Sequence, residues 1–304
     1  SGTSLPRKGG THTQSESGEF HSALCHRLFG SSSAYRIPYS GVSGILMGDA
    51  TAMSQIRLKT PFEVERIRKA GRIAARVLRA CKEAIEPNRT TAGELNALAE
   101  RLVLEMGGFP AFKGYRLYPG VLCVSINEQI VHGLPDGRVI REGDIVSLDI
   151  GVFYEGFCCD TAITVIAGHT DYQRKRLVRY TEEALRVGIE HARPGNTTGD
   201  ISYAIESYVK QGGFQPAQGL AGHGVGRFLH EMPDIPNWGM QPGKGVKLQP
   251  GMVLAIEPMI VMGSPEVEIA DDHWAIITRD RKPAAHFEHT VLVTENGAEI
   301  LTIE

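Results

Sequence analysis

The alternation of hydrophobic and polar residues over residues 60–304 predicts a mixture of helices and strands. The first helix has a clear start, because Thr60, Pro61 and Glu63 form a capping box with proline at the first helical position. Apolar residues then recur at helical spacing until Pro87. Four helices are expected. The first runs from this start to residue 86, the second follows Thr91 and ends at residues 107–108, and the other two cover residues 171–191 and 199–210. Strands are expected over residues 121–126, 130–133, 145–152, 157–161, 252–256, 274–277, 286–293 and 299–303.

A weak internal repeat divides this pattern into two halves. Residues 87–95, followed by Gly-Gly-Phe at 107–109, resemble residues 194–201, followed by Gly-Gly-Phe at 212–214. Each copy predicts a capped helix followed by strands that carry acidic residues. Related halves would direct these acids toward one common site. Chance similarity of proline, glycine and threonine at helix caps is the alternative for so short a repeat.

Two aspartates stand out in the hairpin predicted over residues 145–161. If residues 155–156 form a two-residue turn, Asp160 pairs with Gly151. Asp149 then shares a face with Gly151, because strand side chains alternate, and the two carboxylates lie about 4.5–8 Å apart. A bound cation would offset their repulsion, whereas an aspartate at a strand end would be solvated instead. The hairpin alone favours neither, and a bulged three-residue turn would change the register.

Other candidate residues follow in the second half of the chain. His223 and His230 lie in a glycine-dense loop, for which a surface position is the alternative. Glu257 ends the apolar run 252–256 and precedes a proline, so its carboxylate needs a partner, either a metal ion or an arginine. Glu288 lies in an alternating strand, where an exposed edge position is the alternative.

These candidates together form a set of metal donors, namely Asp149, Asp160, His223, Glu257 and Glu288. Four carboxylates and one imidazole suit Mn, Fe, Co or Zn better than a structural thiolate zinc site. Four carboxylates carry more charge than one divalent cation neutralises. The set therefore favours two ions about 3.5–4 Å apart with bridging carboxylates.

Composition excludes several classes of protein. The 304 residues contain 42% hydrophobic and 22% charged residues, as in an ordinary globular chain, and the net charge of −3 gives no electrostatic reason for nucleic acid as substrate. No apolar run reaches the roughly 18–20 residues of a membrane span. Five cysteines without a C-x-x-C pair indicate a reducing, cytoplasmic compartment. Residues 1–52 are rich in serine and glycine, which predicts a flexible extension before a globular domain of residues 53–304.

The order and spacing of the candidate residues resemble the type I methionine aminopeptidases, metallopeptidases with the pita-bread fold. The resemblance covers residues 56–304 and is carried by Ser125-Ile126-Asn127-Glu128, His132-Gly133, Asp149, Gly156, Asp160-Thr161, Gly222-His223-Gly224-Val225-Gly226, Ile256-Glu257-Pro258-Met259 and Phe287-Glu288-His289-Thr290. It implies an α+β fold in which pseudo-two-fold repeated halves form a central curved antiparallel sheet flanked by helices.

The resemblance also implies roles for individual residues. The five donors would bind two divalent ions (Co, Mn, Fe or Zn), with Asp160 and Glu288 bridging them and Glu257 also acting as general base. His132 and His230 would contact the substrate, one near the scissile amide nitrogen and the other near its carbonyl. The pocket for the methionine side chain would be lined by Tyr115, Tyr118, Cys123, Leu229 and Trp274.

The implied activity is removal of the N-terminal methionine from nascent proteins when the next residue is small. The resemblance further implies a cytoplasmic monomer with transient ribosome association. Leu229, Phe112 and His286 depart from the residues that relatives commonly carry there, which are phenylalanine, cysteine and glutamine. These departures bear on pocket shape and not on the reaction.

Two other functions share this fold. Xaa-Pro aminopeptidases and prolidases carry an additional N-terminal domain, which 52 residues rich in serine and glycine cannot form. Non-enzymatic pita-bread binding proteins have lost metal ligands, whereas all five are present here. Only 33 residues separate His223 from Glu257, too few for the helical insertion of type II enzymes.

Overall fold

The computed structural model describes residues 56–304, so the expected extension and its boundary at residue 52 lie outside the described residues. The described part contains the α-helices α3 (Pro61–Glu83), α4 (Ala92–Glu105), α5 (Tyr172–His191) and α6 (Thr198–Gln211), and the 3-10 helix η1 (Tyr115–Leu117). The four α-helices match the predicted ones to within a few residues. None of these helices is long and apolar enough to cross a membrane.

Threonine side chains fix the starts of three of these helices. Thr60, Thr91 and Thr197 each accept a hydrogen bond from the backbone N–H three residues later, and the acidic side chain of that residue accepts from the threonine N–H. This arrangement satisfies backbone donors that have no partner inside the helix. Local sequence therefore determines where these helices begin.

All strand pairs of the described residues are antiparallel. The first sheet contains β1 (Phe109–Pro110), β2 (Cys123–Ile126), β4 (Ile145–Tyr154) and β5 (Phe157–Ile166), and β4 pairs with the other three. The second has the order β15 (Gly297–Ile300), β14 (His289–Thr294), β9 (Val253–Ile256), β7 (Ala221–Gly224) and β8 (Glu231–Pro236). Two smaller sheets contain β13 (Ala284–His286), β10 (Met259–Val261) and β6 (Gln215–Pro216), and β11 (Val267–Ile269), β12 (Ile276–Thr278) and β3 (Gln129–Val131).

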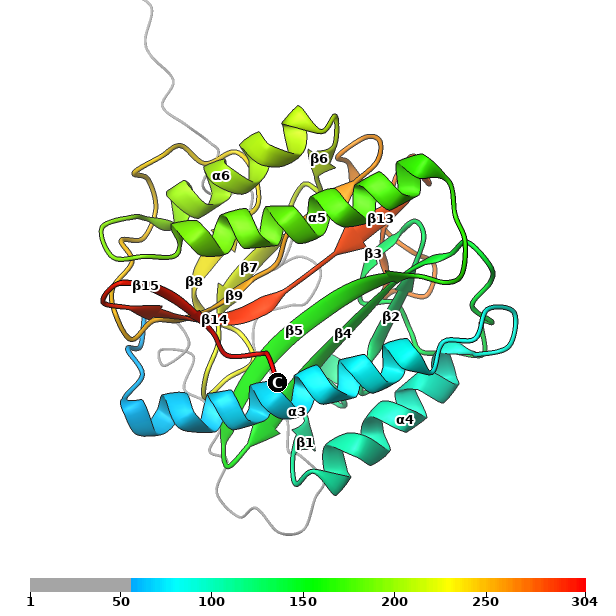
Figure 1. Ribbon diagram of the computed structural model, residues 1–304, viewed down its shortest axis with the longest axis horizontal. Helices are drawn as coiled ribbons and strands as arrows, with labels where there is room; N and C mark the ends of the chain where they lie inside the picture. The colour runs from blue at the N-terminus through cyan, green and yellow to red at the C-terminus, as the bar shows by residue number, and fades with distance from the viewer. Residues whose placement is uncertain (1–55) are drawn as a thin grey trace, which may run out of the picture. The chain divides into compact units, whose positions relative to one another are not determined.

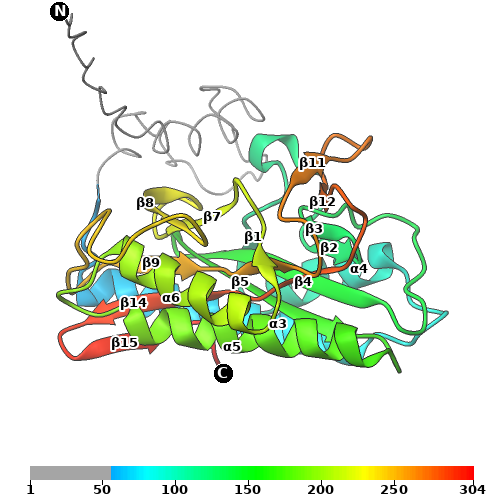
Figure 2. The same cartoon turned by 90° about the horizontal axis from the view of Figure 1, so that it is seen from above.

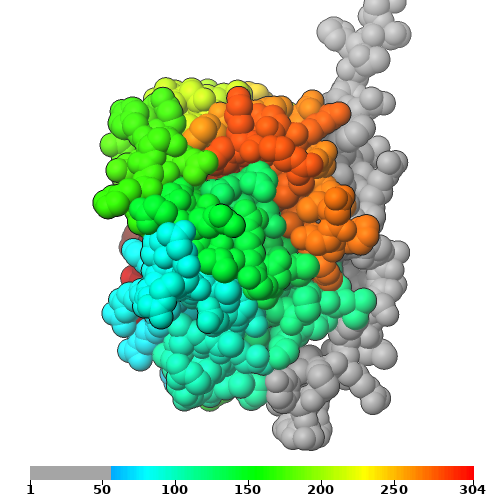
Figure 3. Space-filling model, turned by 90° about the vertical axis from the view of Figure 1, so that its right-hand side faces the viewer, coloured from blue at the N-terminus to red at the C-terminus, as the bar shows by residue number. Residues whose placement is uncertain are grey.

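The helices cover one face of these sheets, and the loops around β7, β8, β11 and β12 lie on the opposite face (Figures 1 and 2). One apolar cluster joins α3 and α4 to the first sheet, and a second joins α5 and α6 to the second sheet. A side view shows β11 and β12, in orange, beside the green segment that contains β3, with which β12 pairs (Figure 3). β3 and β12, which are far apart in the sequence, therefore lie side by side.

The predicted register of the aspartate hairpin is confirmed. Tyr154 pairs with Phe157, and Gly151 pairs with Asp160. The two turn residues, at positions 155 and 156, have φ values of 46° and 81°. Positive φ at both central residues is the signature of the type I′ turn, whose twist matches that of the flanking strands.

The internal repeat is a structural repeat. α6 begins 106 residues after α4 and has the same length, and β6 begins 106 residues after β1. Thr91 and Thr197 cap the two helices in the same way, and each also forms an isolated β-bridge. Gly107 and Gly213, which follow the helices, both have a φ of 78°, in the left-handed region that favours glycine. Chance similarity of caps is therefore excluded.

Several strand predictions were wrong in extent. The strand expected over residues 286–293 is interrupted at residues 287–288, which separate β13 from β14. The strand expected from residue 274 begins at Ile276, and the one expected at residue 121 begins at Cys123. The short strands β1, β6, β7, β8, β10 and β11 were missed, because pairing with distant segments rather than local pattern defines them. His223, which was expected in a loop, therefore lies in a strand, β7. The four cysteines in the described part of the chain are all free and buried.

Candidate metal centre

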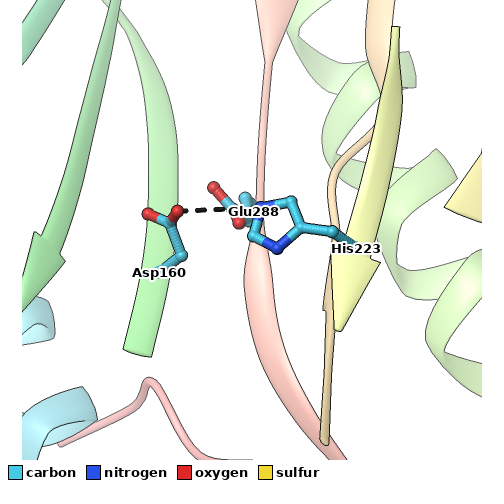
Figure 4. Close-up of side chains that lie close together, drawn as sticks. All are labelled: Asp160, His223 and Glu288. Atoms are coloured by element: carbon cyan, nitrogen blue, oxygen red, sulfur yellow. Dashed lines mark ion pairs between the residues drawn. The ribbon is translucent and has the colours of Figure 1, made fainter. Parts of the chain in front are cut away.

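Three buried side chains from different strand segments point toward one another (Figure 4). Asp160 lies in β5, His223 in β7, and Glu288 between β13 and β14. Nε2 of His223 lies 3.9 Å from Oδ2 of Asp160, and one donor atom of each of the three residues lies within 4.8 Å of the others. The three residues are 5%, 6% and 1% exposed in that order, so the group is shielded from bulk water.

A second group of donors shares Glu288 with the first. It consists of Glu257, which follows β9, His286, which ends β13, and Glu288, again with donor atoms within 4.8 Å of one another. Glu257 lies between two imidazoles, with Oε1 3.5 Å from Nε2 of His223 and Oε2 3.5 Å from Nε2 of His286. His286 is not among the ligands predicted from the sequence. Its position two residues before Glu288, on the same face of an alternating strand, was the signal that could have identified it.

Asp149 completes the cluster from β4. Its Cα partners are Cys123 on β2 and Ala162 on β5, so it lies one alternation from the Gly151–Asp160 pair. The negative charge of Asp149 raises the pKa of Asp160, as expected when the two aspartates share a face of the hairpin. The structure therefore brings together all five predicted ligands. Metal binding by each of them stays a prediction.

Two glycines explain how β7 can carry a ligand in this crowded place. A Cβ on Gly222 would lie 2.3 Å from the carbonyl oxygen of Ala255, and one on Gly224 would lie 2.3 Å from that of Met232. β7 is sandwiched between β8 and β9, so only glycine permits these approaches. Nδ1 of His223 lies 2.9 Å from the Gly224 carbonyl, which can only accept. Nδ1 therefore carries the proton, and the Nε2 lone pair faces the carboxylates.

Threonines hold β5 against the segment that carries Glu288. The Thr290 hydroxyl donates to the Asp160 carbonyl at 2.7 Å and accepts from the Asp160 N–H at 2.9 Å. The Thr161 hydroxyl donates to the Glu288 carbonyl at 2.8 Å. Thr164 makes the corresponding pair of hydrogen bonds with the backbone of residue 286. We had assigned no role to these threonines. They fix the backbone of the candidate ligands, a function that only the paired strands reveal.

Burial dominates the electrostatics of the cluster. It raises the pKa of Asp149 and Glu257 to about 7. It also raises the pKa of Asp160 and Glu288 well above the usual range, and repulsion from neighbouring carboxylates adds to this rise. The carboxyl groups are thus held partly neutral because no positive side chain compensates them. Among residues 56–304, these carboxylates form ion pairs only with His223 and His286, and neither lysine nor arginine pairs with them.

The cluster fits divalent metal ions. Oδ1 of Asp149 and Oε1 of Glu288 are buried and have no hydrogen-bond partner among the described residues. Unpartnered buried carboxylate oxygens are costly, and a cation at the centre of the cluster would satisfy them. Carboxylates with imidazole form a donor set for Mn, Fe, Co or Zn. An arginine partner for Glu257, the alternative considered from the sequence, does not occur among residues 56–304.

His132 and His230 lie beside this cluster. The ring of His230 is 4.1 Å from that of His223, and its Nδ1 lies 3.0 Å from the hydroxyl of Tyr115. Burial lowers the pKa of His132 to about 4 and that of His230 well below its ordinary value, and the positive neighbour Arg116 adds to both shifts. Both rings are therefore neutral at neutral pH. His132 has a φ of 59°, an unusual value for a residue other than glycine and one that clusters at functional sites.

The expected pocket residues gather next to the candidate ligands. Tyr118 packs edge-on against Trp274 with ring centroids 5.2 Å apart, and its hydroxyl donates to the Gly133 carbonyl at 2.8 Å. Cys123 pairs in register with Asp149, so the pocket adjoins the ligand cluster. Leu229 is buried in the same apolar cluster, whereas Tyr115 stacks on His230. Phe112, another departure from the family pattern, contacts Tyr118 with centroids 6.5 Å apart.

Comparison with known proteins agrees with this site. The sequence model of metallopeptidase family M24 matches residues 65–295. Methionine aminopeptidase 1 of Bacillus subtilis is 46% identical over 244 residues, which are 80% of this chain and 98% of that protein. The crystal structure of the methionine aminopeptidase of Thermotoga maritima is 48% identical, with a TM-score of 0.81, and the match covers 82% of this chain and 100% of that one.

A more distant likeness links the chain to proline-specific peptidases. The prolidase of Pyrococcus furiosus is 27% identical with a TM-score of 0.66, and the match covers 81% of this chain but 65% of the prolidase. The pita-bread fold expected from the sequence is confirmed by these structural relatives. The family match spans most of the described residues and denotes peptidases that use divalent metal ions. The chain therefore belongs to metallopeptidase family M24 and, within it, to the methionine aminopeptidases.

Proposed function

We propose that this protein is an aminopeptidase that removes the N-terminal methionine from nascent proteins when the next residue is small. The observation that supports this proposal is the convergence of carboxylates and His223 in one buried cluster without a compensating lysine or arginine among residues 56–304. It occurs in a chain that is 46% identical to a methionine aminopeptidase over 80% of its length.

We infer that the cluster holds two divalent ions of Co, Mn, Fe or Zn. The two donor groups share only Glu288, and a single divalent cation would leave four carboxylates with excess negative charge. Asp160 and Glu288 would bridge the ions, and Asp149, His223 and Glu257 would complete their coordination. When bound, such an ion pair lowers the pKa of a water molecule and polarises the scissile carbonyl.

Glu257 would be the general base. Its carboxylate oxygens lie 3.5 Å from Nε2 of His223 and 3.5 Å from Nε2 of His286, inside the cluster. From this position the carboxylate can take a proton from the attacking water and return it to the leaving amine. Its backbone carbonyl accepts a hydrogen bond of 2.8 Å from the Asn237 side chain, which fixes the segment after β9.

His132 and His230 would bind the scissile amide. Both imidazoles are neutral, so an N–H of either ring can donate to the carbonyl oxygen as negative charge develops on it. The Tyr115 hydroxyl, 3.0 Å from Nδ1, orients His230. Tyr118, Cys123, Leu229 and Trp274 would then receive the methionine side chain, because a polarisable thioether packs well against aromatic and thiol groups.

Peptide hydrolysis tests the proposal. Purified protein, freed of metal and then loaded with each candidate ion, is expected to release methionine from Met-Ala-Ser and to leave Gly-Pro and Ala-Pro peptides intact. Glu257→Ala should abolish release, whereas Glu182→Ala, at an exposed position on α5, should not change it. Absence of methionine release with every ion would refute the proposal. Cleavage before proline would instead indicate an Xaa-Pro peptidase.

We further propose that the enzyme acts as a cytoplasmic monomer that contacts the ribosome transiently. The substrate supports this, because N-terminal methionine is first exposed on nascent chains. Light scattering after size exclusion should give the mass of one chain, and sedimentation with translating ribosomes should be weak and sensitive to salt. A stable dimer would contradict the first part, and equal sedimentation with and without ribosomes would contradict the second.

A further inference from the structure

His286 is a buried imidazole to which the proposed mechanism gives no task. It is 1% exposed, and neither Nδ1 nor Nε2 has a hydrogen-bond partner among the described residues. A neutral imidazole has one donor and one acceptor, and leaving both unpaired in the interior is unfavourable. Something that protein groups in the described part of the chain do not provide would have to satisfy this ring.

The backbone fixes the position of this ring. The backbone N–H of His286 donates to the Thr164 hydroxyl at 2.9 Å. The same hydroxyl donates to the backbone carbonyl of His286 at 2.5 Å. His286 also pairs with Met259 across β13 and β10. With the main chain held on two sides, the ring is presented to the carboxylate cluster by rigid structure rather than by a loop, as a precise ligand site requires.

The distances from the ring suit a shared ion better than direct hydrogen bonds. Nε2 lies 3.5 Å from Oε2 of Glu257 and 3.9 Å from Oε2 of Glu288. Both distances exceed the usual range for a nitrogen–oxygen hydrogen bond, about 2.7–3.2 Å. Two donors on one transition-metal ion, each about 2.0–2.2 Å from it, lie roughly 3 Å apart, so a small contraction would bring these atoms onto a common ion.

We propose that His286 is an additional metal ligand, which gives the second ion of the pair an imidazole of its own. The inference rests on the two-ion site of the proposed function. One donor group contains Asp160, His223 and Glu288, and the other contains Glu257, His286 and Glu288. Each group therefore has one imidazole, and they share a single carboxylate. An added nitrogen ligand favours Co and Zn over Mn, because imidazole binds the later metals more strongly.

Counting imidazoles on the bound ions tests this assignment without reference to turnover. X-ray absorption of protein loaded with two equivalents of Zn is expected to show imidazole scattering equivalent to one ring per ion. His286→Gln should halve this signal, and His223→Gln should halve it too. The double variant should lose the signal, and His169→Gln, at an exposed position after β5, should leave it unchanged.

Calorimetric titration provides a second measurement. His286→Gln is expected to weaken binding of the second Co ion by at least about 10-fold and binding of Mn by less. Wild-type affinity for both ions with an unchanged imidazole signal would overturn the proposal. If His286→Gln does not fold, His223→Gln alone decides, since loss of all imidazole scattering in that variant would also overturn it. If the wild-type protein binds two ions as expected but releases no methionine, the proposed function is overturned instead of the ligand assignment.

Discussion

Metal binding should release protons, because the metal-free site holds them. Burial raises the pKa of Asp149 and Glu257 to about 7, and it raises the pKa of Asp160 and Glu288 well above the usual range. A carboxyl group binds a cation only after it loses its proton. At pH 7 Asp149 and Glu257 are each about half protonated, so these two groups together release about one proton when ions bind, and Asp160 and Glu288, whose pKa is also raised, add to this release.

The number falls as the solution becomes more alkaline. At pH 8 the two groups with a pKa of about 7 are each only about one-tenth protonated, and their share of the proton count drops from about one to about 0.2. The assay is calorimetric titration with Mn in buffers of different ionisation enthalpy, in which the slope of observed enthalpy against buffer enthalpy gives the proton count. Asp149→Asn should lower the count at pH 7 by about one half. Asp271→Asn, at an exposed position, should not change it.

The affinity of the site for metal ions should depend on pH, because binding releases these same protons. The apparent association constant for two ions should rise between pH 6.5 and 8, since each displaced proton adds one power of ten per pH unit. Release of less than one proton at pH 7, together with an affinity that does not change with pH, would refute the reasoning that burial keeps these carboxyl groups neutral. Such a result would mean that water or an unrecognised cation already compensates the cluster.

Three other predictions follow from the same contacts. Gly222→Ala should lower the free energy of unfolding in urea by about 1–3 kcal/mol, because its Cβ would lie 2.3 Å from the Ala255 carbonyl oxygen, whereas Gly137→Ala meets nothing within 4 Å and should have little effect. Thr290→Val should weaken metal binding about 10-fold in calorimetry by removing both hydrogen bonds to the Asp160 backbone, and wild-type affinity would contradict this. The melting temperature of metal-free protein should fall from pH 7.5 to 8, because the folded state keeps carboxyl protons that the unfolded chain has already lost, while above about pH 7.5 the buried histidines are neutral in both states. Scanning fluorimetry that showed a rise would contradict it.

Features that depend on neighbouring residues could be predicted from the sequence. Three helices begin at threonine capping boxes, and the turn at residues 155–156 sets the register that brings Asp160 opposite Gly151. Each of these is determined within a few residues, by hydrogen bonds or backbone angles that particular residue types supply. The ligand set followed from chemistry and from resemblance to a family, and the structure brings all five residues together.

Features that depend on distant segments could not be predicted in the same way. The break between β13 and β14 arises where Glu288 leaves the alternating pattern to pair with Ala162, 126 residues earlier. The contacts of Thr164 and Thr290 exist only after these strands meet. The sequence indicated only that His286 differs from the residue common in relatives. Its position, with Nε2 3.5 Å from Oε2 of Glu257, is visible only in the folded structure. Periodicity carries no information about which strands become neighbours.

The candidate metal centre lies where the two repeated halves meet, and this explains its composition. The first half contributes Asp149 and Asp160, and the second contributes His223, Glu257 and Glu288. The donor group of Asp160, His223 and Glu288 takes residues from both halves, whereas Glu257, His286 and Glu288 all lie in the second half. The repeat therefore duplicated helices and caps but not the chemistry. Hydrogen bonds from threonines hold the carboxylates of the two halves close together although they repel one another. Cations bound between these carboxylates would make the arrangement favourable.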